Sequence, residues 1–262
     1  MRMSYAPFRD SSSLLHDPEK LRARMSEDGY LFMRAVAPKD EVLNARRDVL
    51  NLCKEAGWID PTDLMAAKWS GAGPFTEGDA PYMKLYQQIL RLKSFHELPA
   101  HPTFMNLMAK VLDSEVLLHN RRIGRVTFPN NTMQTTAAHQ DYHYIRGTSD
   151  TYTIWLPLGD CPIALGGLAL LRGSHKAGLI EHRMHAEKKY AGHGLDDDQL
   201  PPGLQWDAGD FQAGDFLVFH SYTIHKALPN LTPDQLRLST DNRYQRAGDA
   251  IADVSKGTHY NL

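Results

Sequence analysis

The chain has 262 residues, of which 42% are hydrophobic and 23% are charged, and this balance is typical of one globular domain with a sizeable core. Its 29 Lys and Arg against 31 Asp and Glu give a formal charge of −2, so the bulk charge attracts neither nucleic acid nor an anionic membrane. The two cysteines, Cys53 and Cys161, lie far apart, which argues against a disulfide framework or a zinc knuckle. No run of about 18 apolar residues predicts a membrane span, and no secretory signal is recognisable. We therefore expect a cytoplasmic protein with a small-molecule partner.

Three segments of the first half repeat apolar residues at the spacing of an α-helix. The clearest pattern covers residues 38–56, which begin with a proline and are followed directly by a glycine. Similar patterns cover residues 82–95 and 102–112. We expect residues 1–114 to be mostly helical.

Residues 59–81 are rich in Gly, Pro and Asp and have no clear period, which predicts a long loop. Long ordered loops often carry function. Trp69, Phe75 and the following Tyr82 could form a lid over a binding site. The alternative, which is the commoner role of loop aromatics, is that they fix the loop to the core.

After about residue 115 the pattern changes to short strands separated by Gly, Pro and Asn clusters. The candidate strands lie within residues 115–128, 151–158, 166–175, 214–225 and 235–245. This half of the chain therefore predicts a β sandwich or barrel.

The stretch AHQDYHYIRG, residues 138–147, places His139, Asp141 and His143 at alternating positions. On an extended strand, residues i and i+2 project from the same face, so His139 and Asp141 could present an imidazole and a carboxylate to one point. Such a pair alone is weak evidence for a metal site, because a polar strand face looks the same.

A third metal ligand could come from GDFLVFHSYTIH, in which an apolar strand leads to His220 and then His225. Two histidines and one carboxylate bind Fe(II) on one face of its octahedron and leave three positions open, as in non-haem iron oxygenases. Open coordination positions indicate that the metal takes part in a reaction rather than holding the fold together.

In one large class of these oxygenases a 2-oxo acid chelates the iron, and its free carboxylate needs a cationic partner. Arginine suits this role because its planar fork binds a carboxylate through two bonds. Arg237 follows His225 by 12 residues, and a strand there would put Arg237 and Ser239 on one face and Leu236 and Leu238 on the other. The alternative for Arg237 is an ordinary solvent-facing arginine.

The segments HQD, GGLALLRGSHKAGL, GDFLVFH, HKALPN and RLSTDNRYQ resemble, in order and wording, the phytanoyl-CoA dioxygenase family of Fe(II)- and 2-oxoglutarate-dependent oxygenases. EDGYLFMRAV resembles the family's N-terminal helix-to-strand entry, so the resemblance covers most of the chain and is weakest over residues 58–81. It implies a mainly β fold, a double-stranded β-helix or cupin-like jelly roll, with N-terminal helices against one sheet.

The resemblance also implies a domain plan and a set of iron ligands. Residues 1–262 would form one oxygenase domain, with residues 1–114 as helical buttress and lid and residues 115–262 as jelly-roll core. His139, Asp141 and His225 match the iron ligands and are the implied catalytic residues, and His220 is the competing choice for the last of them.

For the cosubstrate, Arg237 matches the arginine that holds the distal carboxylate of 2-oxoglutarate. Trp155 matches an aromatic residue of the same pocket, although a core tryptophan between two sheets would look alike. Some members have a small hydroxyl residue two positions after the distal histidine, where this chain has Ala227. Ser239 or Thr153 would then supply that hydrogen bond.

The retained Asp141 favours hydroxylation over halogenation, because related halogenating enzymes replace this carboxylate by a small residue. The implied reaction hydroxylates an aliphatic carbon of a small molecule, consumes O2 and 2-oxoglutarate, and releases succinate and CO2. The alternative from another class is a catalytically silent jelly-roll protein that binds a metal or small ligand.

Substrate recognition is the least determined part of the sequence. In RRIGRVTF a strand would place Arg121 and Arg125 on one face and Arg122 on the other. A charged solvent-facing surface is the favoured interpretation, and carboxylate or phosphate binding is the alternative. His143 could contact substrate or lie in solvent.

Overall fold

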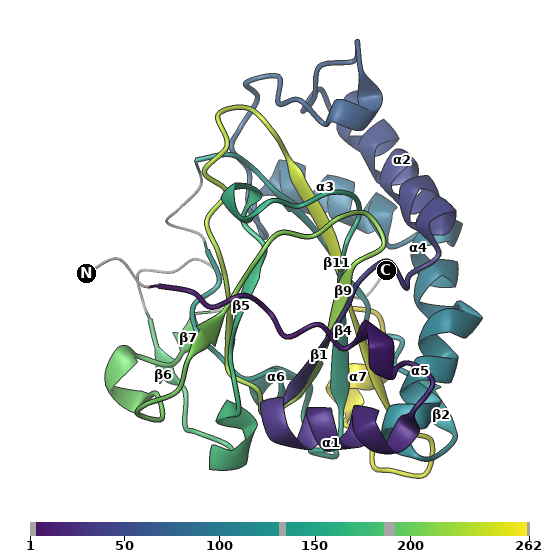
Figure 1. Ribbon diagram of the computed structural model, residues 1–262. Coiled ribbons are helices and arrows are strands. Elements are labelled where there is room, and N and C mark those ends of the chain that lie inside the picture. The colour runs from purple at the N-terminus through teal and green to yellow at the C-terminus, as the bar shows by residue number, and fades with distance from the viewer. Residues whose placement is uncertain (1–3, 131–134, 186–191, 261–262) are drawn as a thin grey trace.

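The computed structural model describes residues 4–130, 135–185 and 192–260 (Figure 1). Its helices are α1 (Pro18–Asp28), α2 (Lys39–Glu55), α3 (Ala80–Ile89), α4 (Lys93–Glu97), α5 (Pro102–Leu112), α6 (Tyr142–Ile145) and α7 (Asp253–Lys256). Its strands are β1 (Tyr30–Met33), β2 (Val116–Leu118), β3 (Ile123–Thr127), β4 (Tyr152–Pro157), β5 (Leu168–Leu171), β6 (Arg183–Met184), β7 (His193–Gly194), β8 (Trp206–Asp207), β9 (Phe216–His220), β10 (His225–Ala227) and β11 (Arg237–Arg246).

Two antiparallel sheets form the centre of the molecule. The major sheet has the order β1-β9-β4-β11-β2, with β3 also paired to β11, and the minor sheet has the order β10-β5-β8. Figure 1 shows the minor sheet on one side of the major sheet and helices α2 to α5 along the other side. This confirms the predicted jelly roll with N-terminal helices.

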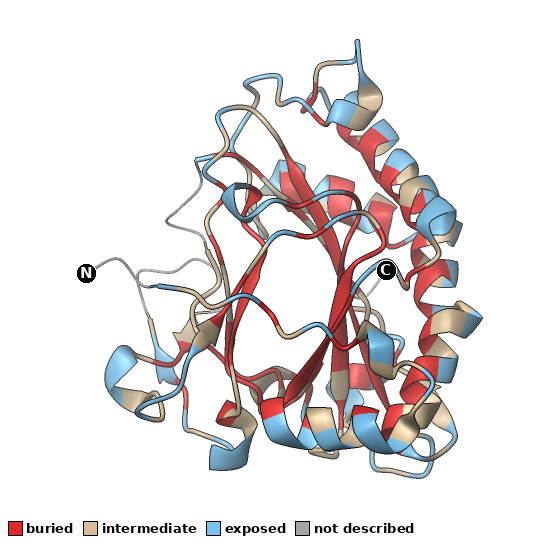
Figure 2. Cartoon of the chain, in the orientation of Figure 1, coloured by how far each residue is buried: buried red, intermediate tan, exposed pale blue. Residues whose placement is uncertain are grey.

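Strand alternation sorts the side chains of the major sheet into two cores. Leu31 of β1, Leu156 of β4 and Val218 of β9 belong to a cluster shared with the helices. Their neighbours Trp155 and Phe219 belong to a second cluster, which includes Leu168 and Leu170 of β5 and so lies between the sheets. Figure 2 shows buried residues along the strands and on the inner sides of the helices. The space between the sheets is where inward polar side chains meet.

The predicted helix over residues 82–95 is wrong as a single element, because α3 ends at Ile89 and α4 begins at Lys93. A continuous helix would turn Leu90 away from the buried face that carries Leu85. The break allows Leu90 and Phe95 both to be buried in the core beside the helices. The apolar pattern over residues 82–95 thus corresponds to two packed helices.

The first half also supplies one strand, β1, to the edge of the major sheet. Helix α1 ends at Gly29, whose φ of 78° is left-handed, and the chain then pairs Tyr30 with Phe219 of β9. A Cβ atom at Gly29 would collide with Nδ1 of His175, so glycine suits this close approach as well as the left-handed φ.

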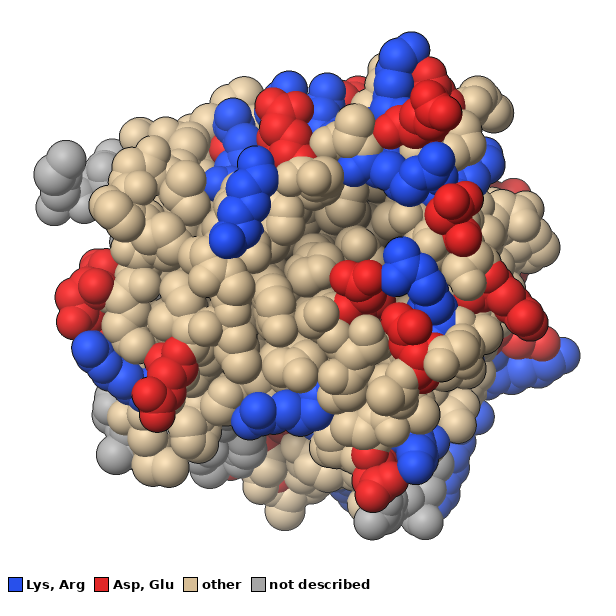
Figure 3. Space-filling view, turned by 90° about the horizontal axis from the view of Figure 1, so that it is seen from below, with Lys and Arg blue, Asp and Glu red and all other residues tan. Residues whose placement is uncertain are grey.

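The surface has no feature that suggests a large charged partner on the side seen in Figure 3, where Lys and Arg alternate with Asp and Glu around a largely uncharged centre. In the described part of the chain no helix is both long and apolar enough to cross a membrane.

Candidate active site

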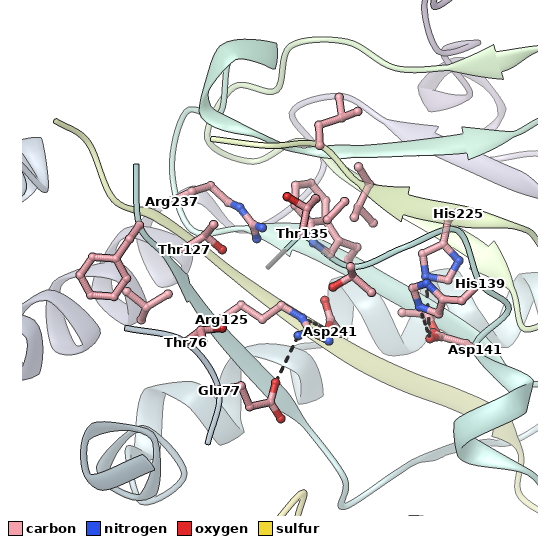
Figure 4. A pocket seen from close by; sticks show the side chains of 18 of the residues that line it. Thr76, Glu77, Arg125, Thr127, Thr135, His139, Asp141, His225, Arg237 and Asp241 are labelled. Atoms are coloured by element: carbon pink, nitrogen blue, oxygen red, sulfur yellow. Dashed lines mark hydrogen bonds and ion pairs between the residues drawn. The ribbon is translucent and has the colours of Figure 1, made fainter. Parts of the chain in front are cut away.

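Three side chains of the type that binds metals meet between the sheets. One ligand atom from each of His139, Asp141 and His225 lies within 4.8 Å of the others. The Nε2 atoms of His139 and His225 lie 3.7 and 3.8 Å from the same Asp141 oxygen, and all three residues are buried (Figure 4). The donor set of two imidazoles and one carboxylate suits non-haem Fe(II).

The backbone brings the two histidines together directly. His139 and His225 form an isolated antiparallel bridge, with N–H to O distances of 2.9 and 3.0 Å in the two directions. The extended geometry predicted for residues 139–143 is wrong beyond this bridge, because Asp141 has helical φ and ψ angles of −59° and −32° and begins α6. The N–H of Tyr142 donates to the carbonyl of Ser221 at 3.1 Å, which fixes that turn beside β9.

Each histidine has its second nitrogen occupied by the main chain. Nδ1 of His139 lies 2.8 Å from the carbonyl of Ala137, and Nδ1 of His225 lies 3.0 Å from the carbonyl of Thr223. A carbonyl only accepts, so in both rings the proton lies on Nδ1 and the Nε2 lone pair faces Asp141. This tautomer leaves Nε2 of each ring free to coordinate a metal.

The carboxylate of Asp141 is held in place by two further side chains. The hydroxyl of Thr153 donates to it at 2.5 Å, and the Arg243 guanidinium lies 3.2 Å away. Burial raises the pKa of Asp141, yet that pKa lies well below its usual range, and the largest opposing cause is the positive charge of Arg243. Asp141 is therefore charged and oriented before any metal binds.

His220, the competing ligand, lies elsewhere. Its Nε2 is 3.7 Å from Asp150, and its Nδ1 accepts a hydrogen bond from the N–H of Tyr222. Among the described residues the cluster whose geometry could hold a metal ion contains His225 and not His220.

Arg237 is buried and lines the same cavity as the three ligands (Figure 4). Its Nη1 donates to the Ser239 hydroxyl at 2.5 Å, and its guanidinium lies 5.9 Å from the Trp155 ring centre. In the described structure its Nε has no hydrogen-bond partner although it is buried. A buried guanidinium with an unused donor fits a carboxylate ligand such as that of 2-oxoglutarate.

The other two cosubstrate candidates occupy different positions relative to the cavity. Trp155 is buried in the cluster between the sheets and also lines the cavity. Its position is therefore compatible both with a core tryptophan and with an aromatic residue of the cosubstrate pocket. Ser239 contacts Arg237 rather than the cavity itself. Thr153 lines the cavity, but its hydroxyl donates to Asp141.

The sequence interpretation missed two residues that follow Ser239 on β11, Asp241 and Arg243. Both line the cavity because they continue the alternation that starts at Arg237. That period of two was the signal that could have identified them. Asp241 accepts a hydrogen bond from Arg125 at 2.9 Å, and Arg125 also lies 3.6 Å from Glu77.

Glu77 comes from the long loop, which therefore reaches the cavity. Phe75 and Tyr82 line it as well, whereas Trp69 packs 6.5 Å from the Phe128 ring and donates its indole N–H to Ala72. The loop aromatics thus divide between the two roles considered from sequence.

The favoured interpretation of Arg121 and Arg125 as a solvent-facing surface is wrong. Both line cavities next to the iron-type cluster. Arg125 does so from β3, which pairs with the inward-facing part of β11, and Arg121 lies just before that strand. Arg122 points away and donates to the main chain of His96 at 2.9 Å. His143 stacks on another histidine ring outside the cavity.

Comparison with known proteins agrees with this geometry. The sequence model described as Phytanoyl-CoA dioxygenase (PhyH) matches residues 25–238. A 1-deoxypentalenic acid 11-beta-hydroxylase of Streptomyces exfoliatus is 28% identical over 270 residues, which cover 95% of this chain and 92% of that protein. The enzyme of the same name from Streptomyces arenae is 27% identical over 98% of this chain and 95% of its own length.

Two solved structures share the fold. The epimerase SnoN in complex with Fe3+, alpha ketoglutarate and nogalamycin RO has a TM-score of 0.64 and 23% identity, over 90% of this chain and 86% of that one. EvdO2 from Micromonospora carbonacea var. aurantiaca has a TM-score of 0.62 and 20% identity, over 96% of both chains. The chain belongs to the phytanoyl-CoA dioxygenase family and is a 2-oxoglutarate-dependent non-haem iron dioxygenase.

Proposed function

We propose that His139, Asp141 and His225 bind Fe(II) and that Arg237 binds the distal carboxylate of 2-oxoglutarate, in an enzyme that hydroxylates an aliphatic carbon of a small molecule. The observation that carries this is the shared cavity, which has the metal-type cluster on one side and a buried arginine with an unused donor on the other. Two relatives that align over nearly the whole chain are named hydroxylases, which supports hydroxylation.

We include the domain plan in this proposal. Residues 1–262 form one oxygenase domain, in which residues 1–114 support and partly cover the site and residues 115–262 build the jelly-roll core. Contacts from Glu77 of the long loop to Arg125 of β3 support the covering role.

When bound, Fe(II) with 2-oxoglutarate and O2 would supply the oxidising power, because this system couples oxidation of a substrate to formation of succinate and CO2. The chain's own residues do the binding and positioning. His139 and His225 present Nε2 lone pairs, and Arg243 and Thr153 keep Asp141 ionised and oriented as the third ligand. Only three protein ligands take part, so further coordination positions stay available.

Arg237 and Trp155 orient the cosubstrate. The guanidinium offers a fixed fork to a carboxylate, and Ser239 holds that fork by accepting from Nη1. The Trp155 ring, together with Phe219 and Leu168, forms buried apolar walls that keep water away from the reacting groups. Ser239 therefore acts through Arg237.

An anaerobic titration of the metal-free protein with Fe(II) and then 2-oxoglutarate tests the proposal. We expect the weak visible charge-transfer band of a chelated 2-oxo acid in the wild type and in His220→Ala, and its weakening in His225→Ala and Arg237→Ala. Succinate release in air measures turnover. A wild-type protein that binds metal but shows neither the band nor succinate would instead be the catalytically silent jelly roll.

A further inference from the structure

A second cavity also reaches the proposed iron site, and Arg237 is not among its lining residues. It has a volume of about 180 Å³ and shares six lining residues with the cavity that Arg237 lines, namely Glu77, Arg125, Thr136, His139, Asp141 and Arg243. Arg237 lines only the first cavity, and Arg121 lines only the second. We call the second one the Arg121 cavity. A molecule bound there would lie beside the metal ligands without displacing a cosubstrate held by Arg237.

Arg121 is half-buried and has no carboxylate within salt-bridge distance among the described residues. Its one hydrogen bond in that part of the chain goes from Nη1 to the carbonyl of Val254, at 3.3 Å. Burial lowers its pKa, and the nearby Arg243 lowers it further by repulsion. By contrast, Arg125 is paired with Asp241 and Glu77, and Arg243 is paired with Asp141.

The charges that line the two cavities do not balance. Among the described residues, the four arginines are Arg121, Arg125, Arg237 and Arg243, and the three carboxylates are Glu77, Asp141 and Asp241. Fe(II) and the 2-oxoglutarate dianion would cancel each other. One positive charge therefore remains in the loaded site, and uncompensated charge in a partly desolvated cavity is costly.

His259, which also lines the Arg121 cavity, is neutral and does not change this count. Burial, together with the positive charges of Arg121, Arg125 and Arg243, lowers the pKa of His259 to about 2. The low pKa of this ring comes first from burial and then from the same positive charges.

We propose that Arg121 binds a carboxylate of the substrate, so that the substrates of this enzyme are small carboxylic acids with an apolar body. This rests on the proposed function, because the substrate must lie beside the iron. One excess positive charge matches a carboxylate, whereas a phosphate monoester carries nearly two negative charges at neutral pH. The walls formed by Ile123, Ile145 and Tyr144 suit an aliphatic body that extends from Arg121 toward His139 and Asp141.

The test compares pairs of probes on the anaerobic enzyme loaded with Fe(II) and 2-oxoglutarate. Cyclohexanecarboxylate and 1-adamantanecarboxylate are each titrated by calorimetry beside the primary amide of the same carbon skeleton, and cyclohexyl phosphate is a third arm. The wild type should prefer each acid over its amide by roughly ten- to a hundredfold, the range for a hydrogen bond to a charged group. Arg121→Gln should reduce this preference to within about twofold, and Arg121→Lys should keep part of it.

Arg122→Gln is the matched control, because the neighbouring arginine points to His96 and not into the cavity. It should retain the preference for acids. Equal wild-type binding of acid and amide, no saturable binding of either acid at millimolar concentration, tighter binding of the phosphate, or a preference that survives Arg121→Gln would each overturn the proposal.

The comparison of acid and amide binding to the wild-type enzyme does not depend on whether any variant folds. The affinity for 2-oxoglutarate, measured in the same preparations, should be unchanged by Arg121→Gln. A protein that binds 2-oxoglutarate normally but ignores the acids would contradict only the role of Arg121. One that fails to bind 2-oxoglutarate would contradict the proposed function itself.

Discussion

The two sides of the cavity are prepared for their ligands to different degrees. On the side of His139, Asp141 and His225, each imidazole is fixed by a backbone carbonyl, and the carboxylate is fixed by Thr153. On the other side, buried Arg237 keeps a donor without a partner in the described structure. The ligand groups of the proposed metal side are thus positioned by hydrogen bonds within the protein, although the Nε of Arg243 beside Asp141 also has no partner among the described residues. On the proposed cosubstrate side, the guanidinium that would bind the ligand itself keeps the free donor.

Removal of one metal-binding side chain should have the largest effect. His225→Ala or Asp141→Ala leaves two ligands, and we expect Fe(II) affinity to fall by more than the roughly 10- to 100-fold typical of losing an outer partner of a ligand. The metal-to-protein ratio after anaerobic dialysis measures this. His220→Ala is the control, since its ring pairs with Asp150 outside the cluster. If His220→Ala lost iron and His225→Ala kept it, the assignment would be reversed.

Substitution of Arg237 should affect the cosubstrate side alone. Arg237→Ala removes a charged donor worth about 2 to 3 kcal/mol, so the dissociation constant of 2-oxoglutarate should rise by roughly 30- to 150-fold. Arg237→Lys should recover little, because a lysine cannot reproduce the planar fork. Fe(II) affinity, measured in the absence of 2-oxoglutarate, should not change in either variant. A large loss of iron would show that the two sides are not independent.

Local sequence rules identified the parts of the site that depend on strand alternation or chain order. Arg237 and Ser239 were placed on one face by a period of two, and the same rule extends to Arg243. The resemblance to the phytanoyl-CoA dioxygenase family, through the order of its motifs, indicated His225 rather than His220. The facing of Arg237 and Ser239 depends on neighbouring residues, whereas the choice of His225 depends on motifs from separate segments of the chain.

The remaining contacts join residues that are distant in sequence. Arg243 and Asp141 are 102 positions apart, and Glu77 reaches Arg125 from a loop without periodicity. The single turn of α6 after Asp141 covers four residues, which is too short for a helical pattern to show. Only tertiary packing determines these contacts, so the charge balance of the cavity could not be obtained from the sequence.

Loss of the Thr153 hydroxyl tests how far the metal side depends on the side chains around its ligands. Thr153→Val keeps the shape but removes the donor to Asp141, so Fe(II) affinity should fall by about tenfold. Thr151→Val is a matched control, because that hydroxyl donates to the carbonyl of Thr148 instead. Equal iron affinity in both variants would mean that Arg243 and the backbone suffice to orient Asp141.

The smallest effect should come from Ser239, which touches Arg237 but does not line the cavity. Ser239→Ala removes one neutral acceptor worth about 1 kcal/mol, so the dissociation constant of 2-oxoglutarate should rise by roughly fivefold. Combining it with Arg237→Ala should add nothing further, because Ser239 acts only through that guanidinium. Titrations of 2-oxoglutarate into the two single variants and the double variant measure this coupling. Additive losses would mean instead that Ser239 contacts the cosubstrate directly, and the cosubstrate side would then contain two independent binding groups.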